Sequence, residues 1–270
     1  MRQARRSWPV CPVRKMYTSR LADGDEDKVE QVPKRLAKEP ILEALFELRF
    51  STGAPTAADI LQSSIFPTFR ERLPSLTRTP IGSMPPALIA ANPELRYQAR
   101  LILQGKPLAI FIGDNAIALS CRRPYLGWSK FRPIILELLE CVQKAALKIE
   151  PERFSLRYMN MFEGENHFAS TRFAATLGKY DLKTANTFTR TEFVEEGHTI
   201  IVELGSHSVA KSPDGPELKG MICTLDTINM SPKGFWDNPA PMIDKTHDIE
   251  KSTFFGILTE EAIKKMGPEY

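Results

Sequence analysis

Apolar and polar residues alternate along two segments of the chain that lie 108 positions apart. In the first segment, residues 41–50, the apolar residues Phe46, Leu48 and Phe50 alternate with polar ones. The second segment, residues 153–162, repeats this pattern. Successive side chains of a strand point to opposite faces of a sheet. Both segments therefore predict half-buried strands, and one such strand opens each half of the chain.

Several shorter apolar segments are separated only by tight turns. In the first half these are residues 95–103, 107–112 and 116–121, and in the second half residues 187–194 and 198–204. Connections this short join antiparallel neighbours, because parallel strands need a long crossover. The pattern predicts an antiparallel meander in the first half and a hairpin in the second.

Helical periodicity is clearest in the segment that begins at Ser129 as its N-cap and runs to Ile149. Its apolar residues recur at intervals of three and four positions. A shorter helix in the first half is expected to bend or end at Pro67, because proline lacks the backbone donor. In the second half, helical pieces are expected near residues 173–177 and from Ile243 onward.

With a further strand at residues 221–228 of the second half, both halves read as strand, helix, three strands and helix. This order predicts an α+β fold, with a mostly antiparallel sheet backed by helices and a duplicated β-α-β-β-β-α unit. We expect one domain over residues 38–270, made of similar halves at about residues 40–150 and 151–268. A disordered tail, basic and then acidic, is expected over residues 1–37. By layout alone the arrangement resembles the saddle of the TATA-binding protein or a helix-grip sheet, and layout does not carry function.

The net charge of +3 is set by the N-terminal tail. Residues 1–20 hold six of the 36 basic residues and no acidic one, which leaves 30 basic against 33 acidic residues elsewhere. A mildly acidic body argues against nucleic-acid binding. No apolar run approaches the roughly 18–20 residues that cross a bilayer, so we expect no membrane association. Met16 is an alternative start.

The four cysteines are Cys11, Cys121, Cys141 and Cys223, and no two of them form a C-x-x-C pair. The last three lie inside apolar segments, where a buried reduced thiol is the usual state. This cysteine usage predicts a cytoplasmic protein.

Two arginines occupy equivalent positions, in Leu48-Arg49-Phe50 and Leu156-Arg157-Tyr158. If the two strands are equivalent, both arginines point away from the core. They would then form, with Glu47, a polar surface that grips a carboxylate, a phosphate or a partner loop. The alternative, which we favour for the arginines themselves, is that they neutralise nearby carboxylates such as Glu43 and Glu47.

Two further residues are candidates for a ligand or partner site. Asp226 lies in an apolar strand and needs a partner, for which Arg49 or Arg157 would serve. Trp128 lies beside Tyr125 and Phe131 at the turn into the long helix. Stacking on a ligand is one function for these aromatic residues, and closing the edge of the core is the more frequent one.

Signatures of catalysis and metal binding are missing. The four histidines show no H-E-x-x-H or H-x-H spacing, and we find no nucleophile elbow, P-loop or dinucleotide fingerprint. His247 and Glu250 are three positions apart, which makes a weak metal or acid–base pair; a solvated surface is the more frequent arrangement. We expect no catalytic residue, no metal site and no cofactor.

Three motifs carry a resemblance to a known family. They are Pro40–Phe50, Pro124-Tyr125-Leu126-Gly127-Trp128-Ser129-Lys130-Phe131 and Phe154-Ser155-Leu156-Arg157-Tyr158-Met159-Asn160. Over residues 39–266 the chain resembles a sporadically distributed family of bacterial proteins of similar length. The resemblance implies a bacterial, cytosolic setting and no particular activity. A patchy distribution is associated with mobile elements and phage defence.

The leading hypothesis is a non-catalytic interaction protein, an accessory of a defence or toxin-related operon. It would bind a protein partner or a small anionic ligand on the sheet face that carries Arg49 and Arg157. The alternatives are a hydrolase or nuclease-like enzyme that uses Asp226, His247 and Glu47, and nucleic-acid binding on the sheet face. A homodimer is also left open.

Overall fold

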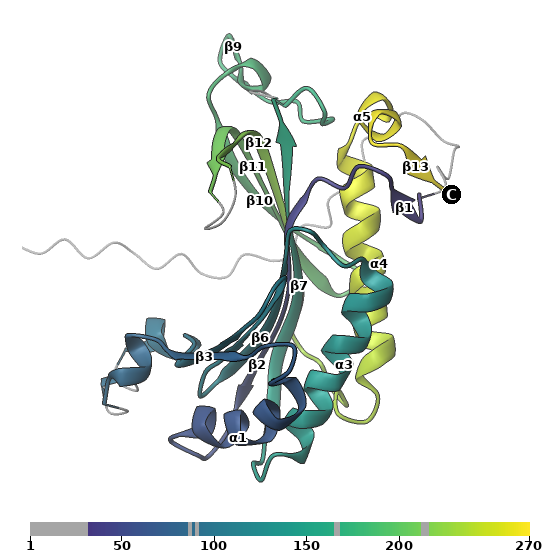
Figure 1. Cartoon of the computed structure of the whole chain (residues 1–270). Coiled ribbons are helices and arrows are strands. Elements are labelled where there is room, and N and C mark those ends of the chain that lie inside the picture. The colour runs from purple at the N-terminus through teal and green to yellow at the C-terminus, as the bar shows by residue number, and fades with distance from the viewer. Residues whose placement is uncertain (1–31, 86–87, 90–91, 165–167, 212–215) are drawn as a thin grey trace, which may run out of the picture.

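The chain folds around a large antiparallel sheet with helices on one face (Figure 1). The structure is a computed structural model, and it describes residues 32–85, 88–89, 92–164, 168–211 and 216–270. In this part of the chain every pair of neighbouring strands in the nine-stranded sheet is antiparallel. The predicted α+β class with a mostly antiparallel sheet is confirmed.

The strands are arranged alike on both sides of a central pair, apart from one additional strand at one edge. From one edge to the other the strands are β10 (Phe188–Glu195), β11 (His198–Ala210), β12 (Leu218–Asn229), β7 (Glu150–Glu163), β2 (Ile41–Ser51), β6 (Ala116–Arg122), β5 (Leu108–Ile112), β4 (Leu101–Gln104) and β3 (Ser75–Arg78). Outward from the β2–β7 pair, each side presents the last, the middle and the first strand of a meander. Descent of the two halves from one duplicated unit stays a prediction.

The register of the central pair places the two arginines on one face. Glu47 of β2 lies opposite Ser155 of β7. Arg49 lies two positions after Glu47, and Arg157 lies two positions after Ser155. Both arginines therefore share the face of Glu47 and Ser155. The alternate residues, which include Phe46 and Leu156, are fully buried on the other face. We call the face that carries the two arginines the open face, and the opposite one the helix face.

Helices α1 (Ala57–Phe69) and α3 (Trp128–Lys144) pack on the first-half strands and bury one apolar cluster there. Helix α1 continues two residues beyond Pro67, because the buried side chain of Phe69 anchors its last turn in the core. Helix α3 begins earlier than predicted. Its N-cap is Gly127, and Ser129 lies inside its first turn.

The second half departs from the predicted unit. Between β7 and β10 the described residues form the strands β8 (Thr176–Leu177) and β9 (Tyr180–Asp181) and a single 3-10 turn, and the helix predicted at residues 173–177 is wrong. The segment buries Phe168, whereas Leu177 is exposed, so no continuous apolar stripe supports a helix there. Helix α4 (Pro239–Ile257) and the short α5 (Glu260–Lys265) cover the second-half strands.

The first residues of the described chain are not part of a tail. Strand β1 (Arg35–Leu36) pairs with β13 (Pro268–Glu269), and the Leu36 side chain is buried in the second-half core. Residues 35–37 therefore belong to the folded domain, which corrects the predicted boundary. Residues 1–31 lie outside the described chain.

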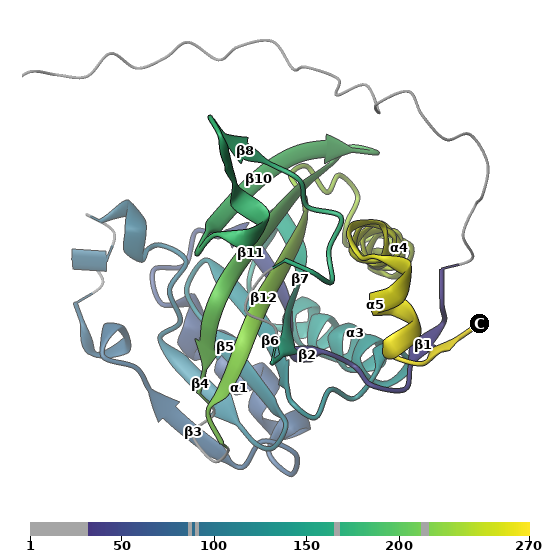
Figure 2. The same cartoon turned by 90° about the horizontal axis from the view of Figure 1, so that it is seen from above.

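The long helices lie side by side on the helix face (Figure 2). Arg132 of α3 makes two hydrogen bonds to the Asp244 carboxylate of α4, at 2.5 and 2.8 Å. The Trp236 indole, just before α4, donates to the carbonyl of Ile149 at 3.0 Å. These contacts fix the two helices relative to the centre of the sheet. Within the described residues, no helix is both long and apolar enough to cross a membrane.

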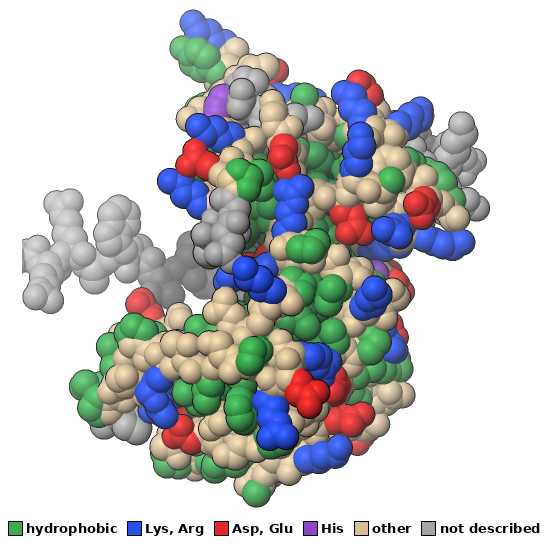
Figure 3. Space-filling view, in the orientation of Figure 1, with side chains coloured by type: hydrophobic (Ala, Val, Ile, Leu, Met, Phe, Trp, Pro, Cys, Tyr) green, Lys and Arg blue, Asp and Glu red, His purple; other side chains and the backbone are tan. Residues whose placement is uncertain are grey.

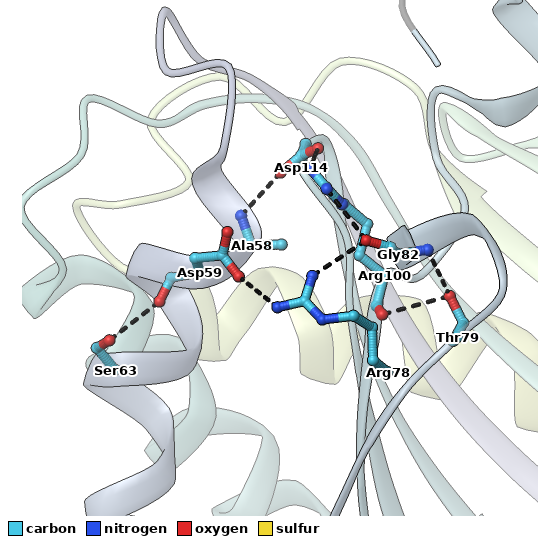
Figure 4. A network of polar contacts seen from close by, with 8 residues as sticks. All are labelled: Ala58, Asp59, Ser63, Arg78, Thr79, Gly82, Arg100 and Asp114. Atoms are coloured by element: carbon cyan, nitrogen blue, oxygen red, sulfur yellow. Dashed lines mark hydrogen bonds and ion pairs between the residues drawn. The ribbon is translucent and has the colours of Figure 1, made fainter. Parts of the chain in front are cut away.

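A polar network holds α1 against the outer strands (Figure 4). Asp114, in the turn between β5 and β6, accepts from the backbone N–H of Ala58 at 2.9 Å and from Arg100 at 2.8 Å. Arg78 of β3 donates to Gly82 and to Asp59 of α1. The Arg100 side chain is only 6% exposed, whereas those of Arg78 and Asp59 are nearly half exposed. The buried pair therefore carries most of the stabilisation.

We predict that Asp114→Ala lowers the free energy of unfolding by roughly 3 kcal/mol, because it leaves a buried guanidinium unpaired. Asp59→Ala, which breaks only the exposed pair, should cost less than about 1 kcal/mol. Urea denaturation followed by circular dichroism measures both values. Equal losses for the two variants would contradict this assignment.

Candidate functional site

The candidate residues at the centre of the open face are paired with one another. Arg49 Nε donates to Glu47 Oε1 at 2.7 Å, and Arg153 Nη2 donates to the same oxygen at 3.0 Å. The Arg49 guanidinium also lies over the ring of Tyr97, 4.5 Å from its centroid. The interpretation of Arg49 as a side chain that neutralises Glu47 agrees with this geometry.

Arg157 forms the second ion pair of the open face. Its Nη2 donates to Asp226 Oδ2 at 2.7 Å. The Asp226 side chain is 6% exposed, whereas that of Arg157 is 46% exposed. The expectation that the acid in this apolar strand would have an arginine partner is confirmed, and the partner is Arg157.

The two predicted arginines do not form a single clamp. Arg49 and Arg157 are separated by four residue steps along the central pair, or ~14 Å. Each already binds a carboxylate of its own. One small anion would have to displace both carboxylates and span both positions. The open face is therefore a poor site for bidentate capture of a small ligand.

A pocket of about 590 Å³ lies on the helix face, between the start of α3, the middle of α4 and the segment around β1. We call it the helix-face pocket. Its lining includes the candidate residue Trp128, and Tyr158 and Asn160 of β7. In the space-filling view, apolar side chains come to the surface between the upper and lower parts of the molecule, with basic side chains around them (Figure 3).

Aromatic side chains form the walls of this pocket. The rings of Trp128 and His247 stack at 3.9 Å between centroids, with an angle of 8° between their planes. The Tyr125 and Tyr158 rings meet edge to face, and their hydroxyl oxygens are 3.1 Å apart. Burial raises the pKa of both tyrosines. The hydroxyls therefore stay protonated at neutral pH and act as hydrogen-bonding groups.

Glu250 is the least expected residue of the pocket. It is 4% exposed, lines the pocket, and its Oε1 has no hydrogen-bond partner in the described chain. Burial raises the pKa of this carboxyl well above its usual value, and the charge of Asp226 raises it further. Burial therefore favours the protonated form of Glu250. A neutral carboxyl offers one O–H donor and one carbonyl acceptor on adjacent atoms.

His247 and Glu250 do come together in the structure. They are three positions apart on α4, and both line the helix-face pocket. Burial lowers the pKa of His247 to about 4, against the opposing effect of Asp248. The described residues contain no group of three or more ligands that would hold a metal ion. The imidazole is a neutral wall of the pocket.

The residues of the enzyme hypothesis are not brought together. Asp226 and Glu47 are bound to arginines on the open face, whereas His247 stacks on Trp128 on the helix face. The sheet lies between them. The described structure therefore gives these three groups no common reaction centre.

The pocket combines residues that the sequence analysis treated separately. Trp128 and Tyr125 belong to one of the motifs that carry the family resemblance, and Tyr158 belongs to another. Glu250 was noted only for its spacing from His247. A sharper signal was present: Glu250 lies on the apolar stripe of α4, next to the buried Ile249 and Thr246, where an acid is unusual.

Comparison with protein-family models gave no match, and no curated protein matched the chain. The resemblance to the sporadic bacterial family stays a prediction.

We predict that the imidazole of His247 stays neutral until the pH falls to about 4. Its Cε1–H signal in an NMR titration, assigned by comparison with His247→Gln, measures this directly. Protonation near the ordinary value of about 6.5 would contradict the buried stack.

The lowered pKa of His247 also makes the stability of the fold depend on pH. Between about pH 6.5 and pH 4 the unfolded chain binds a proton at this position that the folded chain does not. Falling pH therefore favours unfolding, by up to ~1.4 kcal/mol per pH unit. The difference in unfolding free energy between the wild type and His247→Gln should follow this slope and be constant above pH 6.5. A flat difference throughout would refute the assignment.

Proposed function

We propose that this protein is a non-catalytic binding protein that holds a small organic ligand in the helix-face pocket. The observation that carries the proposal is the partnerless carboxyl oxygen of Glu250, buried in a pocket with aromatic walls. A buried polar group without a partner costs the fold free energy, and a ligand that supplies the partner removes that cost.

The dimensions and chemistry of the pocket support binding. Ligand sites commonly have volumes of roughly 300–1,000 Å³, with mostly apolar walls and a few convergent polar groups. Here the convergent groups are the Glu250 carboxyl and the hydroxyls of Tyr125 and Tyr158. The pocket also lies against β7, which is one of the two central strands and pairs with a neighbouring strand on each side.

The protonation states favour binding over catalysis. His247 is neutral at pH 7 but held in a stack, and both tyrosines remain protonated. Burial raises the pKa of the nearby Cys121 thiol, and that of Cys223 to about 12, so neither is a thiolate. These groups make hydrogen bonds readily and are poor nucleophiles.

Protein binding on the open face is a second candidate function. The observation that favours it lies at the edge strand β10, where Phe188 and Val194 are 66% and 58% exposed. Exposed apolar residues on an edge strand are suited to contact with another chain. We likewise propose that the protein acts in a bacterial defence or toxin-related operon.

We predict that Glu250→Leu raises the free energy of unfolding by about 1–2 kcal/mol, because it removes a buried polar group without a partner. The same change should abolish ligand binding. Stability is measured by urea denaturation. Binding is measured by thermal shift against a panel of nucleotides, amino acids, sugar phosphates and organic acids.

The matched control is Thr227→Val. Thr227 lies on the helix face of β12 and also has a buried oxygen without a partner, but it does not line the pocket. This variant should gain stability and keep the binding of the wild type. A panel in which no compound shifts the wild type, together with a Glu250→Leu variant that is less stable than the wild type, would overturn the proposal.

A further inference from the structure

The charges around the mouth of the helix-face pocket are mostly positive. Four basic residues line it, namely Lys34, Arg35, Lys130 and Lys251. Within the described chain none of the four forms a salt bridge. Glu39 and the buried Glu250 are the acidic residues of the lining. An anionic group at the mouth would therefore find cations whose charges are not neutralised by direct contact.

The N-terminus of α3 adds backbone donors to this region. Its N-cap Gly127 has no side chain to accept from the first turn, and no side-chain cap replaces it. Trp128 and Ser129 at the start of the helix line the pocket. The first backbone N–H groups of a helix carry a partial positive charge and bind phosphate in many proteins. This helix is 17 residues long.

Lys251 connects the two sides of the mouth. It lies on α4, and its Nζ donates to the backbone carbonyl of Lys34 at 3.4 Å. Burial lowers the pKa of Lys251, against the attraction of Asp248. A half-buried ammonium without a carboxylate in contact gains from an anion beside it.

The interior of the pocket has a different character, because it is neutral and aromatic. In its protonated form, which burial favours, the Glu250 carboxyl in the pocket lining presents a donor and an acceptor side by side, as an asparagine or glutamine amide does. Such an amide pairs with adenine through an amino group and the adjacent ring nitrogen. The stacked Trp128 and His247 rings form a wall suited to a planar ring.

We propose that the helix-face pocket binds a nucleoside monophosphate. This inference rests on the proposed function and names its ligand class. The base would pair with Glu250 inside the pocket, and the phosphate would lie at the start of α3 near Lys130 and Lys251. A neutral carboxyl can carry its proton on either oxygen, so it pairs with the amino and ring-nitrogen edge of adenine or cytosine and equally with the carbonyl and ring N–H edge of guanine or uracil.

Isothermal titration calorimetry at pH 7 with AMP, CMP, GMP, UMP, adenosine and inorganic phosphate tests the proposal. The nucleotides should bind ~10-fold or more tightly than inorganic phosphate, because the base pairs with a buried group that is otherwise unpaired. Adenosine should bind more weakly than AMP, and phosphate alone weakest. Nucleotide binding no tighter than that of inorganic phosphate would overturn the role of the base.

Substitutions at Glu250 separate pairing from packing. Glu250→Gln keeps a donor and an acceptor and should retain AMP or CMP binding within about threefold, whereas Glu250→Leu should lose it. Thermal melting checks that both variants fold. If Glu250→Leu binds AMP as the wild type does, the nucleotide does not occupy this pocket and the proposal fails.

Substitutions at the mouth test the phosphate position. Lys130→Gln and Lys251→Gln should each weaken AMP binding ~10-fold while leaving adenosine binding unchanged. Lys144→Gln, at the exposed far end of α3, is the matched control and should have no effect. Loss of adenosine binding in the mouth variants would contradict the placement.

Failure of the nucleotide class can be distinguished from failure of the proposed function. If no nucleotide binds and another compound of the panel binds in a manner that needs Glu250, the pocket is a ligand site and the nucleotide inference is wrong. If no compound of either set binds and Glu250→Leu only destabilises the protein, the nucleotide inference and the proposed function are both wrong.

Discussion

The antiparallel pairing of β2 with β7 determines which chemistry each face of the sheet carries. In this pair Glu47 lies opposite Ser155, and a slip by one residue would move every side chain to the other face. In the observed register the rings of Phe46 and Phe154 lie on the helix face, with centroids 6.3 Å apart. Burial of these side chains holds the register. The arginines and carboxylates consequently meet on the open face.

The two faces satisfy their polar groups in different ways. On the open face, charges are paired directly, as in Arg157 and Asp226. In the helix-face pocket, the Oε1 atom of Glu250 has no hydrogen-bond partner among the described residues, and burial favours the neutral form of its carboxyl. The two faces still interact, since the charge of Asp226 helps to keep the Glu250 proton in place. Electrostatic interactions through a thin, poorly polarisable sheet are weakly screened.

The strands are easier to predict from the sequence than the helix-face pocket, for a physical reason. A period of two is visible in a single segment, so β2, β7 and the β10–β11 hairpin were predictable from local pattern. The partner of Asp226 was also predictable, because a buried acid needs a cation. The pocket was not, since it joins β1, the start of α3 and the middle of α4, which are far apart in the chain. The missing second-half helix shows that element order alone does not establish a repeat.

Glu250 is best understood together with Thr227, because both leave a buried oxygen without a partner on the same side of the sheet. The threonine is a small neutral group away from the pocket. The glutamate has a larger desolvation cost, and it lies where an apolar residue such as leucine would complete the stripe of α4. Its position beside an empty volume with aromatic walls distinguishes the two. A ligand in the helix-face pocket would offset the cost at Glu250, whereas Thr227 does not line that pocket.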